Sequence, residues 1–202
     1  MIETRLFLYI IIVLSAVIHE YSHGWMAYHL GDSTAKDAGR LTLNPLAHID
    51  PVGTVILPLF LLFTGGVFLG WAKPVPYNPY RLSDQKYGSL KVGLAGPVSN
   101  FILAIIFGLG VRFLIGTSIN SIFIEGLILI TYVNIFLGLF NLLPIPPLDG
   151  SKVVADLFPN QWQAFLKTGF IGTIIAIIVA MTFLPPVAKF IFDLIVGKSF
   201  FM

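Results

Sequence analysis

The residues of this chain that could do chemistry stand together in the run His19-Glu20-Tyr21-Ser22-His23. Histidines four positions apart lie on the same face of an α-helix, so both imidazoles can reach one zinc ion. A glutamate directly after the first histidine can act as a general base toward water held at that ion. This spacing indicates hydrolytic metal chemistry.

The surroundings of this run are apolar. Residues 6–18 carry no formal charge and lead directly into His19. Ionisable side chains at membrane depth are costly and are therefore usually functional. In a water-soluble helix the pattern H-E-x-x-H alone would be a weak signal, but in this position it predicts a zinc site inside the lipid bilayer.

The composition predicts an integral membrane protein. Of the 202 residues, 56% are hydrophobic and 11% are charged, whereas an average soluble domain has about 25% charged residues. No polar stretch is long enough for a separate soluble domain, so we expect a single transmembrane domain over residues 1–202. The net charge of +2 is too small to indicate nucleic-acid binding.

Apolar segments separated by loops predict an all-α fold with about five transmembrane helices. Segment 52–72 is apolar but contains Pro58 and Gly65-Gly66, so it either spans the membrane or re-enters it and turns back. Prolines in loop 73–91 exclude a regular helix there. Residues 187–197 are too short to span and are expected at the membrane interface. The expected helices cover 4–30, 92–115, 120–143, 151–158 (short and amphipathic) and 162–184, the last ending at Pro185-Pro186.

A catalytic zinc usually has three protein ligands, so the two histidines leave one ligand to find. The chain has no cysteine, and the third ligand must therefore be His, Asp or Glu. A helix rises about 21 Å from Arg5 to His19, which places the histidines near loop 31–51. Asp149, after helix 120–143, emerges on that side if segment 52–72 returns to the side it left. The alternative is that Asp149 merely caps helix 151–158.

The basic residues are distributed in agreement with this topology. With a re-entrant segment 52–72, one side of the membrane receives eight basic residues and the other receives Arg5 and Arg112. The positive-inside rule then places the active site at the cytoplasmic face of the cell membrane. The eight residues are Lys36, Arg40, Lys73, Arg81, Lys86, Lys91, Lys152 and Lys167.

Two further motifs follow the H-E-x-x-H run in order: G-P-V-S-N at 96–100 and N-L-L-P-I-P-P-L-D-G at 141–150. Together the three motifs resemble the site-2 protease family of intramembrane zinc metalloproteases (peptidase M50 type). Segment 70–79 looks like that of its compact prokaryotic members, which lack PDZ and CBS domains. By this resemblance His19, His23 and Asp149 match the zinc ligands and Glu20 the catalytic base, while Asn100 and Asn141 match polar positions near the site.

The resemblance implies that transmembrane proteins in the lipid bilayer are the substrates and are cut within their helices. Glu20 would take the proton of a zinc-activated water and pass it to the leaving amine. Asn100 or Asn141 would bind the oxyanion or the substrate backbone, and segment 52–72 would pair with the unwound substrate as an added strand.

Two other classes of protein place histidine and aspartate in a membrane or keep a protease fold without activity. A zinc transporter needs a polar path through several helices, and segments 92–115 and 162–184 offer almost none. A catalytically inactive binding scaffold would lack the base or a ligand, and all four residues are present.

Overall fold

The computed structural model describes residues 2–64, 71–160, 162 and 169–197. Over these residues the secondary structure is helical, with no β-strand. The chain divides into two compact units, residues 1–96 and 97–202, which are described in turn. The single domain expected over 1–202 stays a prediction.

Three of the described helices are long and apolar enough to cross a membrane. They are α1 (Ile2–His29), α4 (Gly88–Leu114) and α5 (Ser121–Asn141). Their length and composition confirm the expected all-α membrane protein. The total of about five transmembrane helices stays a prediction.

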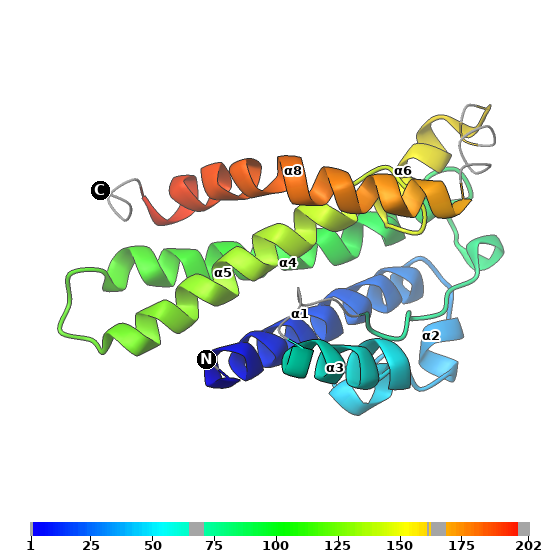
Figure 1. The fold of residues 1–202 in the computed structure, drawn as a ribbon. Helices are drawn as coiled ribbons and strands as arrows, with labels where there is room; N and C mark the ends of the chain where they lie inside the picture. The colour runs from blue at the N-terminus through cyan, green and yellow to red at the C-terminus, as the bar shows by residue number, and fades with distance from the viewer. Residues whose placement is uncertain (1, 65–70, 161, 163–168, 198–202) are drawn as a thin grey trace. The chain divides into compact units, whose positions relative to one another are not determined.

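In the first unit, α1 packs against three short helical segments (Figure 1). These are α2 (Thr34–Asp37), the 3₁₀-helix η1 (Pro45–His48) and α3 (Leu57–Thr64). A π-helix, η2 (Pro51–Ile56), leads into α3, and its first amides are capped by the carboxylate of Asp50. Residues 51–64 are therefore helical, with amides bonded within the helix, and they do not offer the strand edge that was expected of segment 52–72. Residues 65–70 lie outside the described part.

The start of this helical segment lies beside Trp71, the first described residue after it. The backbone N–H of Trp71 donates to the carbonyl of Gly53 (3.1 Å), and the Thr54 hydroxyl donates to the carbonyl of Trp71 (2.9 Å). The Tyr9 hydroxyl of α1 also donates to the Thr54 carbonyl (2.5 Å). The chain therefore leaves and returns at the same level of α1.

After Trp71 the chain is extended over residues 71–78, as the prolines predict. Lys73 N donates to the carbonyl of His48 (2.9 Å), and the buried Arg40 guanidinium donates to the carbonyl of Lys73 (2.6 Å). At the far end, Asn78 N donates to a carboxylate oxygen of Asp32 (2.5 Å). These bonds join loop 31–50 to the extended segment 71–78, so both lie on one side of the first unit.

In the second unit, α5 packs along α8 (Gly169–Val196), and the short helix α6 (Gly150–Leu157) precedes α8 (Figure 1). The expected end of the last helix at Pro185-Pro186 was wrong, as was the separate interfacial piece at 187–197, because α8 continues through both prolines. Its buried residues recur every four positions from just before the prolines to the end of the helix, so one face packs across the prolines, and membrane helices tolerate proline. These residues are Leu184, Ala188, Phe192 and Val196.

Candidate metal centre

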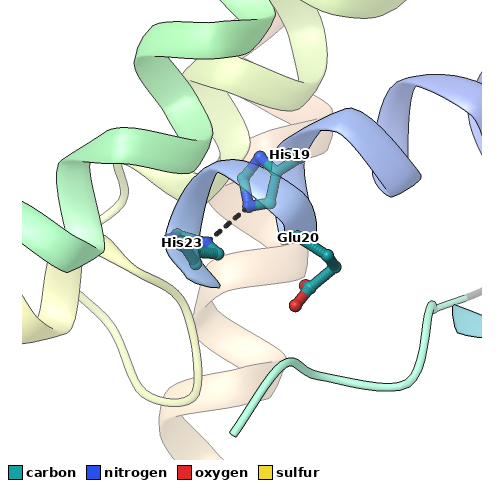
Figure 2. Close-up of side chains that lie close together, drawn as sticks. All are labelled: His19, Glu20 and His23. Carbon is teal, nitrogen blue, oxygen red and sulfur yellow. Dashed lines mark hydrogen bonds between the residues drawn. The ribbon is translucent and has the colours of Figure 1, made fainter. Parts of the chain in front are cut away.

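One turn of α1 brings together His19, Glu20 and His23, whose potential metal-binding atoms all lie within 4.8 Å of one another. The Nε2 atoms of the two histidines are 3.0 Å apart, and both side chains are buried (Figure 2). Nitrogen ligands of a tetrahedral zinc, each about 2.0–2.1 Å from the metal, stand roughly 3.3 Å from each other. The two histidines are thus spaced almost as zinc ligands are.

The ring of His23 is oriented by the backbone of α4. Its Nδ1 lies 2.6 Å from the carbonyl oxygen of Val92, and because a carbonyl can only accept, Nδ1 carries the hydrogen. When the His23 imidazole is neutral, its Nε2 therefore carries no hydrogen and presents a lone pair toward Nε2 of His19. A second ring nitrogen bonded to a backbone carbonyl is the usual arrangement of metal-binding histidines. The donor set and its orientation therefore fit zinc.

Glu20 is held by the extended segment 71–78. Its Oε2 accepts the backbone N–H of Val75 (2.8 Å), and Figure 2 shows its carboxylate directed toward an extended stretch of chain. Val75 stands between Pro74 and Pro76, so it supplies the only amide hydrogen of these three residues. Gly24 allows this approach, because a Cβ there would lie 2.9 Å from Cγ1 of Val75. Among the described residues, the hydrogen bond to Glu20 engages one carboxylate oxygen and leaves the other for water.

Asp32, just beyond the end of α1, carries a shifted carboxyl pKa. Burial raises the pKa, but hydrogen bonds from Thr34 and from the backbone N–H of Asn78 outweigh burial and hold it below the ordinary 3.8. The ionised carboxylate thereby fixes the end of the extended segment whose middle bonds Glu20.

Asp149 lies in the second unit, immediately before α6. Its backbone is helical and its side chain makes no capping hydrogen bond, so the N-cap alternative is not what the structure shows. The carboxylate is 9% exposed, and its Oδ1 lies 2.8 Å from the ammonium of Lys152. Lys152 was missed in the sequence, although its i,i+3 spacing from Asp149 is a signal for such a pair.

The two asparagines expected to bind substrate are both described in the second unit. Asn100 of α4 is fully buried, and its amide donates to the side-chain oxygen of Asn134 on α5 (2.9 Å). Asn141 is half-buried and donates to the carbonyl of Leu137, one turn earlier in α5 (3.0 Å). Asn100 therefore links two helices here, and substrate contact by either asparagine stays a prediction.

The comparisons with known proteins address the class of enzyme. The profile of Peptidase family M50 matches residues 109–185. The chain is 41% identical over 164 residues to "Putative zinc metalloprotease YwhC" of Bacillus subtilis strain 168, covering 78% of this chain and 72% of that protein. It is 28% identical over 184 residues to "Putative zinc metalloprotease Rip2" of Mycolicibacterium smegmatis, covering 91% and 69%. No solved structure matches.

Buried histidines at zinc-ligand spacing on a helix long and apolar enough to cross a membrane, next to a held carboxylate, are typical of a membrane metallohydrolase. The chain belongs to Peptidase family M50. The zinc metalloprotease expected from the sequence is thereby confirmed as the class of enzyme, with zinc as its metal.

Proposed function

We propose that this protein is an intramembrane zinc metalloprotease that hydrolyses peptide bonds within the transmembrane segments of membrane proteins. The observation that carries the proposal is the position of the His19–His23 pair and Glu20 on α1, a helix long and apolar enough to span. In this proposal His19, His23 and Asp149 hold the zinc, and Glu20 is the general base.

The residues of the chain have distinct roles in this reaction. Zinc, when bound, would supply a Lewis acid that polarises the scissile carbonyl and lowers the pKa of water toward about 7. Glu20 accepts the proton of the attacking water through its unengaged oxygen and returns a proton to the leaving amine. The Val75 N–H keeps the carboxylate at one position during both transfers. Asn141 or Asn100 donates to the oxyanion or to the substrate backbone.

The hydrogen bonds that join residues 53–54 to Trp71 support the proposed topology. Segment 51–71 enters and leaves the membrane on the same side, and the positive-inside rule makes that side cytoplasmic in the cell membrane. A substrate helix has its peptide bonds shielded by its own hydrogen bonds, so the substrate unwinds before it is cut. Cleavage then releases a fragment into the cytosol.

Zinc stoichiometry of the purified protein in detergent tests the ligand set. We expect about one zinc per wild-type chain, and loss of zinc in His23→Ala and in Asp149→Ala. Full zinc in Asp149→Ala would place the third ligand elsewhere, and no zinc in the metal-supplied wild type would refute the site.

Cleavage of a tagged single-span protein in proteoliposomes tests the reaction. A substrate with asparagine and glycine in its membrane helix is the suitable probe, because such a helix unwinds readily. Glu20→Gln should retain zinc and lose cleavage, since the amide cannot accept the proton. Cleavage at the wild-type rate by Glu20→Gln would rule out its role as base, and zinc flux without cleavage would favour a transporter.

A further inference from the structure

Gly96, in the third turn of α4, lies directly against the donor nitrogens of the two histidines. A Cβ built on Gly96 would be 2.5 Å from Nε2 of His19, 2.5 Å from Nε2 of His23 and 2.6 Å from Cε1 of His19. Real Cβ atoms essentially never approach other atoms closer than 3.0 Å. The position therefore cannot carry a side chain while the two rings stay where they are.

We propose that Gly96 is part of the metal centre, and that its missing side chain provides the space in which the zinc meets both imidazoles. The proposal deepens the function proposed above and rests on the zinc site of His19 and His23. The three atoms nearest to the absent Cβ lie at the Nε2 edge of the rings. That edge carries the electron pairs that bind a metal.

Other helical glycines of the chain show what simple packing looks like. A Cβ on Gly108 would meet side-chain carbons of Ile195 and Thr131, and one on Gly138 would meet the ring carbons of Phe101. These are apolar contacts between membrane helices, for which small residues are commonly used. At Gly96 the neighbours are instead two potential metal-binding nitrogens and the carbon beside one of them.

The same face of α4 also orients one of the ligands. Val92 stands four residues before Gly96, hence on the same side of the helix, and its carbonyl accepts from Nδ1 of His23. A methyl group at position 96 has two ways to fit. Either the rings rotate and break the bond to Val92, or the methyl covers the nitrogens. Both outcomes prevent zinc from binding.

The test compares Gly96→Ala with Gly110→Ala, a change of the same kind in the same helix. A Cβ on Gly110 has Leu127 Cδ1 at 3.9 Å as its nearest neighbour, so that alanine fits without strain. Both changes add the same helix propensity, about 0.5–1 kcal/mol. Zinc per chain and the thermal midpoint of unfolding are measured for each protein in detergent, with zinc and after chelation.

We expect wild type and Gly110→Ala to hold about one zinc and to unfold at higher temperature with zinc than without. Gly96→Ala should hold less than about a tenth of that zinc and show no zinc-dependent rise. Its chelated form should unfold at the same temperature as chelated Gly110→Ala, which carries the same gain in helix propensity.

Three results would decide against the proposal, each in a different way. Full zinc in Gly96→Ala would overturn the role of Gly96 and leave the proposed function intact. Unfolding of chelated Gly96→Ala far below chelated wild type, with Gly110→Ala unaffected, would make Gly96 a packing residue. Absence of zinc from the wild type itself would refute the metal site on which the proposal depends.

Discussion

Asp149 and Lys152 form a partly buried ion pair one helical turn apart. The carboxylate is 9% exposed and the lysine side chain 30%. Because Lys152 engages Oδ1 and the side chain caps no helix, Lys152 fixes the orientation of the carboxylate. Groups that hold a metal-binding carboxylate in this way commonly matter for affinity or activity.

Lys152→Met should therefore lower zinc affinity or cleavage by about 10- to 100-fold, as loss of an outer partner of a metal ligand usually does. The change removes the charge and hydrogen bond but keeps a side chain of similar length. Zinc affinity by competition with a chelator, together with cleavage rate, measures it. Lys189→Met is the control, since Lys189 also pairs with an aspartate one helical turn away, Asp193 of α8 (2.9 Å). Equal behaviour of the two variants would exclude a role for Lys152.

At this scale, residue types and spacing predicted His19, Glu20 and His23, which the structure brings together, whereas Asp149 was predicted from topology and family resemblance and stays a prediction. The partners of these residues could not be predicted in the same way. Val92 acts through its backbone carbonyl, which every residue has, and Val75 acts through its backbone N–H, which every residue but proline has. Gly96 acts through the absence of a side chain, and only the fold reveals which atoms occupy that space.

Among the helices, the pair Asn100–Asn134 links α4 to α5 through fully buried amides. Asn100→Ala and Asn134→Ala should each destabilise the protein by about 0.5–2 kcal/mol in detergent. The double variant should lose less than the sum, because the two changes remove one bond. Unfolding midpoints of the four proteins measure this coupling. Additive losses, with cleavage impaired only in Asn100→Ala, would instead support direct substrate contact by Asn100.

Asp32 connects the end of α1 to the extended segment 71–78, and its effect should depend on pH. Since the folded pKa is lowered below 3.8, the stabilisation is present above 3.8 and is lost as the pH falls through the folded pKa. Asp32→Ala should cost about 1–3 kcal/mol at neutral pH, the value of hydrogen bonds to a charged group.

The difference in unfolding midpoint between wild type and Asp32→Ala should shrink when the pH is brought well below 3.8. Asp37→Ala, which changes an exposed carboxylate in α2, is the control and should have little effect at either pH. A difference for Asp32→Ala that persists unchanged in acid would show that burial of the side chain, and not its charge, stabilises this junction.

The helices themselves followed from hydropathy, whereas their interruptions were harder to predict. Pro185-Pro186 indicates a helix end by local rules, but the buried face of α8 continues on both sides of the prolines, and packing outweighs the lost hydrogen bonds. Segment 52–72 was ambiguous for the opposite reason. Its hydropathy suits either path, and the hydrogen bonds that Trp71 shares with Gly53 and Thr54 depend on residues far apart in sequence.

For the whole molecule, the path of the chain through the bilayer is the property on which the proposed site depends. The histidines can share a zinc with Asp149 only if α1 and α5 present their C-terminal ends on the same side. That in turn requires loops 31–50 and 71–87 to share a side. In the first unit these loops are joined by hydrogen bonds from Lys73 to His48 and from Arg40 to Lys73.

The absence of cysteine from the chain allows this topology to be tested with single cysteines in an otherwise unreactive protein. Lys36→Cys and Tyr80→Cys place a thiol at exposed positions of the two loops, and Tyr80 is 89% exposed. Because the ends of segment 51–71 are bonded to each other, we expect a membrane-impermeant maleimide to label both in inverted vesicles and neither in intact cells. Thr117→Cys should show the reverse, because it follows α4, whose 27 residues make a helix about 40 Å long.

Labelling of Lys36→Cys and Tyr80→Cys from opposite sides would mean that segment 51–71 crosses the membrane. Asp149 would then emerge on the side away from His19 and His23, and the three-ligand site would have to be abandoned.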